Sequence, residues 1–230
     1  MWIVGVDCAT KDQKVGLAIG KYANGILKIE DADLCSPKTP ATEIIPNWLQ
    51  PEHRPALLAI DAPLGWPIDL ARALTGHRAG KTISTKPDVL FHRETDRFIK
   101  QILRKKPLEV GADRIARTAH AALGMLGELR LRFTAEISLA WSLTDLAGIT
   151  AIEVYPAATL AAHGFLSSGY KKQAQITERR QILAGLEGKI VIPPWLVSKF
   201  ESSADTLDAA VCLLAAKDFL DGRAMSPPPS

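Results

Sequence analysis

The sequence of 230 residues contains only three cysteines and no long apolar run. Cys8, Cys35 and Cys212 are odd in number, widely spaced and surrounded by apolar residues, so neither a disulfide framework nor a zinc site is expected. Such cysteine usage is typical of a reducing compartment, and we expect a cytoplasmic protein. No basic leader precedes an apolar core at the amino terminus, and no apolar run approaches the ~18 residues of a membrane-spanning helix. These absences argue against a secreted or membrane-embedded protein.

An excess of basic charge is also missing, because the formal net charge is only +3. This balance permits a polyanionic partner but does not by itself indicate a nucleic-acid binder. The five histidines show no metal-ligand spacing. Trp48, Trp66, Trp141 and Trp195 are scattered, so we interpret them as core or rim residues rather than as a base-stacking platform.

Strand-like patterns dominate the first part of the chain. Three runs, at 2–8, 14–21 and 26–34, should form an antiparallel meander, because Asn24-Gly25 tolerates the positive φ of a type I′ turn. Two further strands are expected, in the nearly continuous apolar run at 56–65 and within 148–160. The expected fold is therefore an α/β domain with a mixed sheet of five strands, three antiparallel and then two parallel, flanked by helices.

Helical patterns fill most of the remaining sequence. The predicted helical segments are 39–50, a charged stretch from 68 to about 146, 173–186 and an amphipathic final helix at 203–222. We interpret the stretch from 68 to about 146 as a helical insert in a single domain that covers residues 1–222. The tail at 223–230 is rich in proline and serine and is expected to be disordered.

Acidic residues stand near the ends of the predicted apolar elements. Asp7 and Asp61 lie near the ends of the first and fourth strands, so they should converge at the carboxyl edge where open α/β sheets bind ligands. Asp208 shares an apolar stripe of the final helix and should face the sheet. An unpaired carboxylate in an apolar site costs several kcal/mol, so such a group needs a donor, a cation or a raised pKa. A site for Mg²⁺ or Mn²⁺ at Asp7, Asp61 and Asp208 is the economical interpretation.

Glu153 and Asp205 are candidates to complete the shell, Glu153 as a catalytic residue and Asp205 as a metal ligand. Each has a structural alternative. Glu153 could pair with a cation of the insert, and Asp205 could interact with the dipole at the start of its helix. Asp7 and Asp61 could likewise cap turns at the strand ends by accepting hydrogen bonds from backbone amides.

Arg93 and Lys171 are the candidate substrate-binding residues, because arginine and lysine contact phosphates. Arg93 and Asp96 are one helical turn apart, so an intrahelical ion pair is the alternative for Arg93. Lys171 and Lys172 are also compatible with a solvated loop.

The sequence resembles one known family over almost its whole length. The motifs IDAPLGWP, HRETDRF, EVYPAATL, YKK and DTLDAAVCLLAA resemble the domain of unknown function 429 family, whose members are described as predicted nucleases of the ribonuclease H-like fold. Asp7 in GVDCA, Asp61 in AIDAPLG and the acids of DTLDAA, in this strand order, resemble the acidic site of Holliday-junction resolvases. The resemblance implies a ribonuclease H-like fold and a metal-dependent nuclease activity.

The expected function is therefore divalent-metal-dependent hydrolysis of phosphodiester bonds in DNA or RNA, linear or branched. Two ions about 3.5–4 Å apart would activate water and stabilise the leaving oxygen. One alternative is a phosphotransferase of the related sugar-kinase and actin-like fold, although the chain is short and lacks a glycine-rich phosphate loop after any strand. Another is a noncatalytic nucleic-acid-binding module. The sequence leaves open whether the protein forms a homodimer.

Overall fold

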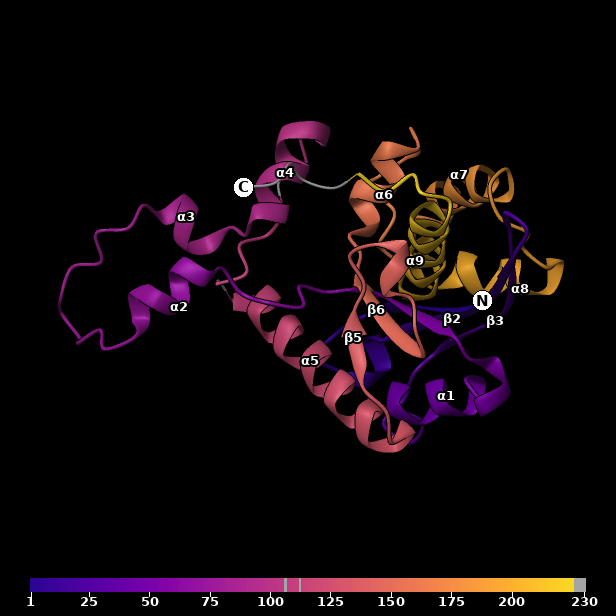
Figure 1. Ribbon diagram of the computed structural model, residues 1–230. Helices are drawn as coiled ribbons and strands as arrows, with labels where there is room; N and C mark the ends of the chain where they lie inside the picture. Colours follow the sequence, from indigo (N-terminus) through magenta and orange to yellow (C-terminus); the bar gives the residue numbers. More distant parts are fainter. Residues whose placement is uncertain (106, 112, 226–230) are drawn as a thin grey trace.

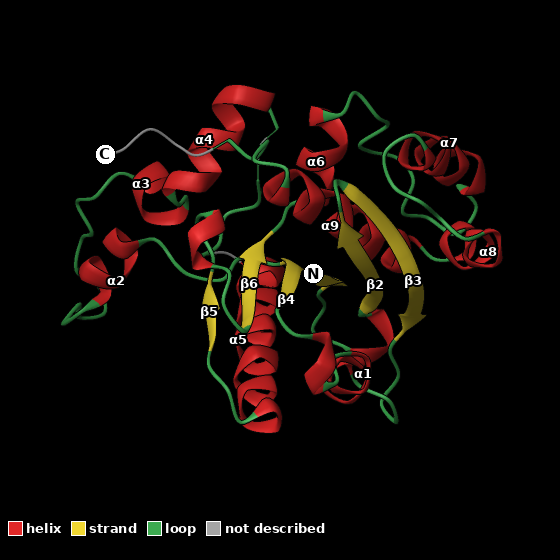
Figure 2. Ribbon diagram, turned by 45° about the vertical axis from the view of Figure 1, so that its right-hand side comes forward, coloured by secondary structure: helices red, strands yellow, loops and turns green. Residues whose placement is uncertain are grey.

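A six-stranded mixed sheet with the order β3-β2-β1-β4-β6-β5 forms the centre of the protein, with β3 at one edge and β5 at the other (Figure 2). The computed structural model describes residues 1–105, 107–111 and 113–225, without the side chain of residue 113. The strands are β1 (Trp2–Asp7), β2 (Gly16–Ala23), β3 (Ile26–Leu34), β4 (Ala56–Asp61), β5 (Ile137–Leu139) and β6 (Ile149–Glu153).

Helices cover both faces of this sheet (Figure 1). They are α1 (Ala41–Trp48), α2 (Ile68–Leu74), α3 (Pro87–Phe91), α4 (Glu94–Leu103), α5 (Asp113–Phe133), α6 (Pro156–Ala162), α7 (Ile176–Glu187), α8 (Pro194–Ser202) and α9 (Ala204–Leu220). Short 3₁₀ turns occur at Asp12–Lys14, Pro51–His53 and Leu143–Asp145.

The antiparallel meander and the parallel half of the sheet confirm the expected strand arrangement. Asn24 and Gly25 have φ angles of 52° and 76°, as the predicted hairpin turn requires. Strand β1 pairs in parallel with β4, and β4 pairs in parallel with β6. In this register Asp7 lies directly beside Asp61.

The predicted number of strands, five, is wrong. The additional strand, β5, pairs in parallel with β6 at the edge of the sheet. It has only three residues, which is too short to show the alternation of a half-buried strand. It also follows directly on a strongly helical sequence, so the predicted helical insert, 68 to about 146, includes it.

The segment from 68 to about 146 has two structurally different parts. Helix α5 packs on the sheet, where Ala122, Leu126 and Leu129 are buried in one core with residues of β1 and β4. The part with α2, α3 and α4 lies beyond the carboxyl edge of the sheet, and α2 and α3 extend away from it at the left of Figure 1. The long helix α5 therefore belongs to the body of the domain.

Helix α9 packs against the opposite face, and its side chains are buried along nearly the whole length. We expected an amphipathic helix, but α6, α7 and α8 also contact α9, so few of its positions face solvent. The helix approaches the sheet closely at two glycines. A Cβ atom at Gly5 or Gly16 would lie 2.0 Å from the backbone oxygen of Ala209 or Asp205, respectively. This close approach brings the first turns of α9 to the ends of β1 and β4.

Within the described ranges, no helix combines the length and the apolar character needed to cross a bilayer. Of the tail predicted to be disordered, 223–230, residues 226–230 lie outside the described part of the chain.

Candidate metal centre

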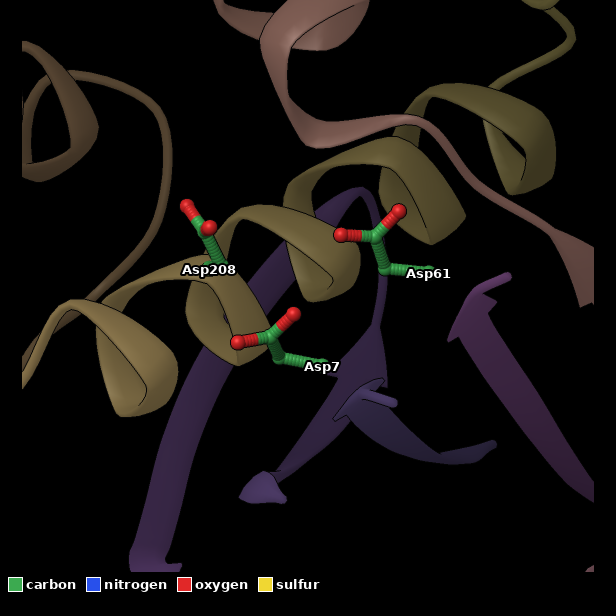
Figure 3. A group of neighbouring side chains, drawn as sticks. All are labelled: Asp7, Asp61 and Asp208. Carbon is green, nitrogen blue, oxygen red and sulfur yellow. The ribbon is translucent and has the colours of Figure 1, made fainter. Parts of the chain in front are cut away.

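Three carboxylates meet where β1, β4 and α9 come together (Figure 3). Asp7 and Asp61 are the last residues of β1 and β4, and Asp208 lies in the second turn of α9. One ligand oxygen from each residue lies within 4.8 Å of the other two. The structure thus brings together the three residues that the sequence indicated as primary metal ligands.

The electrostatics of this cluster favour a bound cation or a bound proton. Burial raises the pKa of Asp7 well above its usual range, and the charges of Asp208 and Asp61 raise it further. Burial and the charge of Asp208 also raise the pKa of Asp61 to about 7. Asp208 is fully buried, and this burial raises its pKa although Lys171 opposes the shift. Three ionised carboxylates at this distance repel one another, and a hard divalent cation relieves that repulsion.

Asp208 has two partners from one loop. The Tyr170 hydroxyl donates a hydrogen bond to Oδ1 of Asp208 over 2.7 Å. The Nζ atom of Lys171 lies 2.6 Å from Oδ2 and forms an ion pair with Asp208. Partial burial disfavours the lysine charge, but Asp208 and Asp7 outweigh this effect and raise the pKa of Lys171. The side chain of Lys171 is 61% exposed, so the ammonium group can leave the cluster without unfolding the loop.

Glu153 lies outside the carboxylate cluster and forms an ion pair with Arg93. The two guanidinium NH groups of Arg93 donate to the two carboxylate oxygens of Glu153 over 2.6 and 2.7 Å. Oε2 of Glu153 also accepts a hydrogen bond from the backbone N–H of Leu64. Arg93 in addition binds Asp96 at the start of α4: its backbone N–H donates to Oδ2 over 2.9 Å, and its guanidinium donates to Oδ1 over 2.8 Å. The structural alternatives for Glu153 and for Arg93 are therefore both present in the structure.

Asp205 lies one turn before Asp208 in α9 but does not belong to the group of three. Its carboxylate is 3.7 Å from Nζ of Lys14, and it occupies the first turn of the helix, where negative charge is favourable. Its charge contributes to the raised pKa of both Asp7 and Asp208.

Sequence reasoning missed two residues that support the centre, Tyr170 and Arg179. Arg179 is buried and donates hydrogen bonds to the backbone oxygens of Tyr170, Lys172, Gln173 and Glu201. It fixes the loop on both sides of Lys171. The YKK motif contained the signal for Tyr170, whereas nothing in the pattern of α7 distinguished Arg179 from its solvated neighbours.

Fold and site together define an α/β protein with a three-carboxylate centre at the carboxyl edge of a mixed sheet. The family model described as "Protein of unknown function (DUF429)" matches residues 5–230, and the chain belongs to this family. The match confirms the resemblance seen in the sequence motifs and includes each residue of the centre. Comparison with curated proteins gives no match.

Proposed function

We propose that the protein is a divalent-metal-dependent nuclease of the ribonuclease H-like fold, which hydrolyses phosphodiester bonds in nucleic acid. The observation that carries this proposal is the convergence of Asp7, Asp61 and Asp208 from three separate elements on one buried point. Strand order and site position, with the acids beside one another on two parallel strands, support the same class.

The donor set fits Mg²⁺ or Mn²⁺, because carboxylate oxygens are the ligands that these hard cations prefer. Asp7, Asp61 and Asp208 would hold the metal, and their raised pKa values indicate how strongly the fold disfavours three uncompensated charges. Asp205 adds negative charge from the preceding turn of α9. A bound ion would supply an activated water and stabilise the charge that develops on the phosphate.

Lys171 provides the cation of the centre in this structure, and we assign it a second role with the substrate. A divalent ion competes with the ammonium group for Oδ2 of Asp208. Once displaced, the ammonium group lies at the edge of the centre, where it can contact a substrate phosphate. We retain Lys171 rather than Arg93 for this contact, because Arg93 is held by Glu153 and Asp96.

A panel of single-stranded, double-stranded and branched DNA and RNA tests the proposed activity. We expect cleavage with Mg²⁺ or Mn²⁺, no cleavage with chelator, and no cleavage by Asp7→Asn. Glu52→Gln serves as the control, because Glu52 is exposed and precedes β4 at the opposite end of that strand. Full activity of Asp7→Asn, or hydrolysis of ATP without cleavage of any nucleic acid, would contradict the proposal.

Thermal melts distinguish a metal ligand from a structural acceptor at Asp7. If Asp7 binds metal, Asp7→Asn relieves repulsion, so the melting temperature without metal should stay the same or rise. Saturating Mn²⁺, at about 100 times its dissociation constant, should stabilise the wild type by about 2.7 kcal/mol and the variant by much less. A loss of stability without metal, together with equal metal shifts, would instead assign Asp7 to a turn cap.

A further inference from the structure

A large cleft lies beside the metal centre and has no role in the chemistry described so far. Its volume is about 850 Å³, within the range of pockets that bind small organic groups. One wall comes from α4 and another from α6 and the end of α9. Leu64–Pro67, after β4, and Glu153–Tyr155, at the end of β6, also line it.

The cleft and the metal centre share the carboxyl edge of the same parallel strands. The backbone N–H of Val154 donates to the carbonyl of Ile60 over 2.8 Å, so the start of the cleft wall lies next to Asp61. Tyr155 lines the cleft and is close enough to Asp61 that, after burial, this carboxylate contributes to its raised pKa. A group bound in the cleft would therefore lie next to a phosphate at the metal centre.

Two tryptophans that are far apart in the sequence both line this cleft. Trp66 follows β4 and is 40% exposed, and Trp141 follows β5 and is 72% exposed. Trp48, by contrast, packs against the core under α1, and Trp195 lies on α8. Exposed indole rings in a concave site are suited to stacking on planar ligands.

The arginines of the cleft are already paired with acidic residues that also line it. Three arginines line it, and each forms an ion pair: Arg93 with Glu153, Arg97 with Glu94, and Arg223 with Asp218. The cleft thus suits a neutral planar ring better than a phosphate. His92 also lines it, is buried, and has an Nε2 atom without a hydrogen-bond partner among the described residues.

We propose that this cleft, the aromatic cleft, binds an unpaired base of the nucleic-acid substrate by stacking on Trp66 and Trp141. The adjoining phosphate then lies at the carboxylate centre. The inference rests on the proposed nuclease function and narrows its substrate to single strands or to structures with unpaired bases, because a base inside a duplex cannot reach such a cleft.

Binding of two labelled oligonucleotides with equal charge tests this inference. One is an oligothymidylate of twelve nucleotides, and the other has the same length and phosphates but abasic sites. Fluorescence anisotropy is measured on the wild type with chelator and on Asp7→Asn with Mg²⁺. The oligonucleotide is not expected to be cleaved in either series. We expect the oligothymidylate to bind at least about tenfold more tightly, since stacking of a base on an aromatic ring has an effect of this size.

Substitutions of the tryptophans test whether the preference for the oligothymidylate arises in the aromatic cleft. Trp66→Ala and Trp141→Ala should each remove most of it, Trp141→Phe should retain it, and Trp195→Ala, at an exposed site on α8, should leave it unchanged. The inference is overturned by equal binding of both oligonucleotides, by an unchanged preference in Trp66→Ala and Trp141→Ala, or by no binding in either series. Metal-dependent cleavage without a base preference would leave the nuclease proposal intact and remove only the aromatic cleft.

Discussion

At the scale of single residues, the centre has more negative than positive charge. Asp7, Asp61 and Asp208 contribute three carboxylates, and Lys171 is the cation in direct contact with the most buried of them. In the folded protein without metal, the ammonium group of Lys171 stabilises the ionised carboxylate of Asp208. Breaking this ion pair would leave a buried charge without compensation. We therefore expect Lys171 to have opposite effects on folding and on the proposed metal binding.

Replacing Lys171 by methionine separates these two effects. Lys171→Met should lower the melting temperature in chelator, since Asp208 loses its cationic partner, and should increase the affinity for Mn²⁺, since a competing cation is gone. The variant should also bind nucleic acid with a salt dependence reduced by about one released counterion. Calorimetric titration with Mn²⁺ and binding at several salt concentrations measure both quantities.

Lys172→Met is the matched control, because Lys172 is the adjacent exposed lysine and its ammonium group forms no ion pair within the described residues. It should leave the Mn²⁺ affinity unchanged. If Lys171→Met behaves like Lys172→Met in both experiments, Lys171 is a solvated surface residue.

At the scale of elements, the position of α9 decides whether the third carboxylate reaches the first two. The helix lies against β1 and β2 at Gly5 and Gly16, where there is no space for a Cβ atom. Strand and helix therefore depend on each other: small residues in the strands permit the contact, and the contact places Asp208 at the strand ends.

Gly5→Ala tests this dependence. The added Cβ would lie 2.0 Å from the carbonyl oxygen of Ala209, so α9 must shift away from β1. We expect a loss of about 1–3 kcal/mol in stability, or more, from overpacking. The affinity for Mn²⁺ should also fall, because Asp208 moves with the helix.

Gly124→Ala provides the control, since Gly124 lies within α5 and a Cβ there meets no atom within 4 Å. Alanine should stabilise that helix by about 0.5–1 kcal/mol and leave metal binding unchanged. A Gly5→Ala variant that is destabilised but binds Mn²⁺ like the wild type would show that the helix position and the centre are not coupled.

The sequence predicted those elements whose pattern is local. The meander followed from Asn24-Gly25, and the convergence of Asp7 with Asp61 followed from the parallel pairing of two apolar strands. Strand β5 was missed because three residues show no usable periodicity. Helix α8, a short segment beginning at two prolines, was also not predicted.

Contacts between distant segments could not be predicted in the same way. Trp66 and Trp141 share a cleft only because β4 and β5 lie on the two sides of β6 in the sheet. Arg179 resembles other arginines of a surface helix, and only the path of the loop after Tyr170 makes it a buried donor. Both features depend on tertiary structure that no local pattern contains.

At the scale of the whole molecule, the sheet and the helical part with α2, α3 and α4 contribute differently to the proposed site. The sheet and α9 provide the carboxylates, whereas α4 provides one wall of the aromatic cleft. The ion pair between Arg93 and Glu153 joins the two parts at the end of β6. The proposed reaction therefore requires both parts, with the scissile phosphate on the sheet and the neighbouring base against the helical part.

The protonation of the carboxylate centre should be visible in the stability of the whole protein. The pKa of Asp61 is raised from near 4 to about 7 in the folded state, chiefly by burial and by the charge of Asp208. A raised folded-state pKa means that the folded protein binds the proton more tightly than the unfolded chain does. The stabilisation of the folded state by this bound proton is complete below about pH 4 and is lost as the pH rises through about 7.

Without metal, the melting temperature of the wild type should therefore decline between pH 5 and pH 8 relative to that of Asp61→Asn, which has no proton to lose at this position. Each unit of pKa difference corresponds to about 1.4 kcal/mol, and 1 kcal/mol shifts the melting temperature of a protein of this size by about 2–4 °C, so the relative decline should be several degrees. Mn²⁺ should reverse the trend, because the proposed ion would bind the deprotonated carboxylates, and its affinity would rise with pH. Parallel pH curves for the wild type and Asp61→Asn in chelator would show that the cluster does not hold a proton in this range, and would contradict the electrostatic basis of the metal centre.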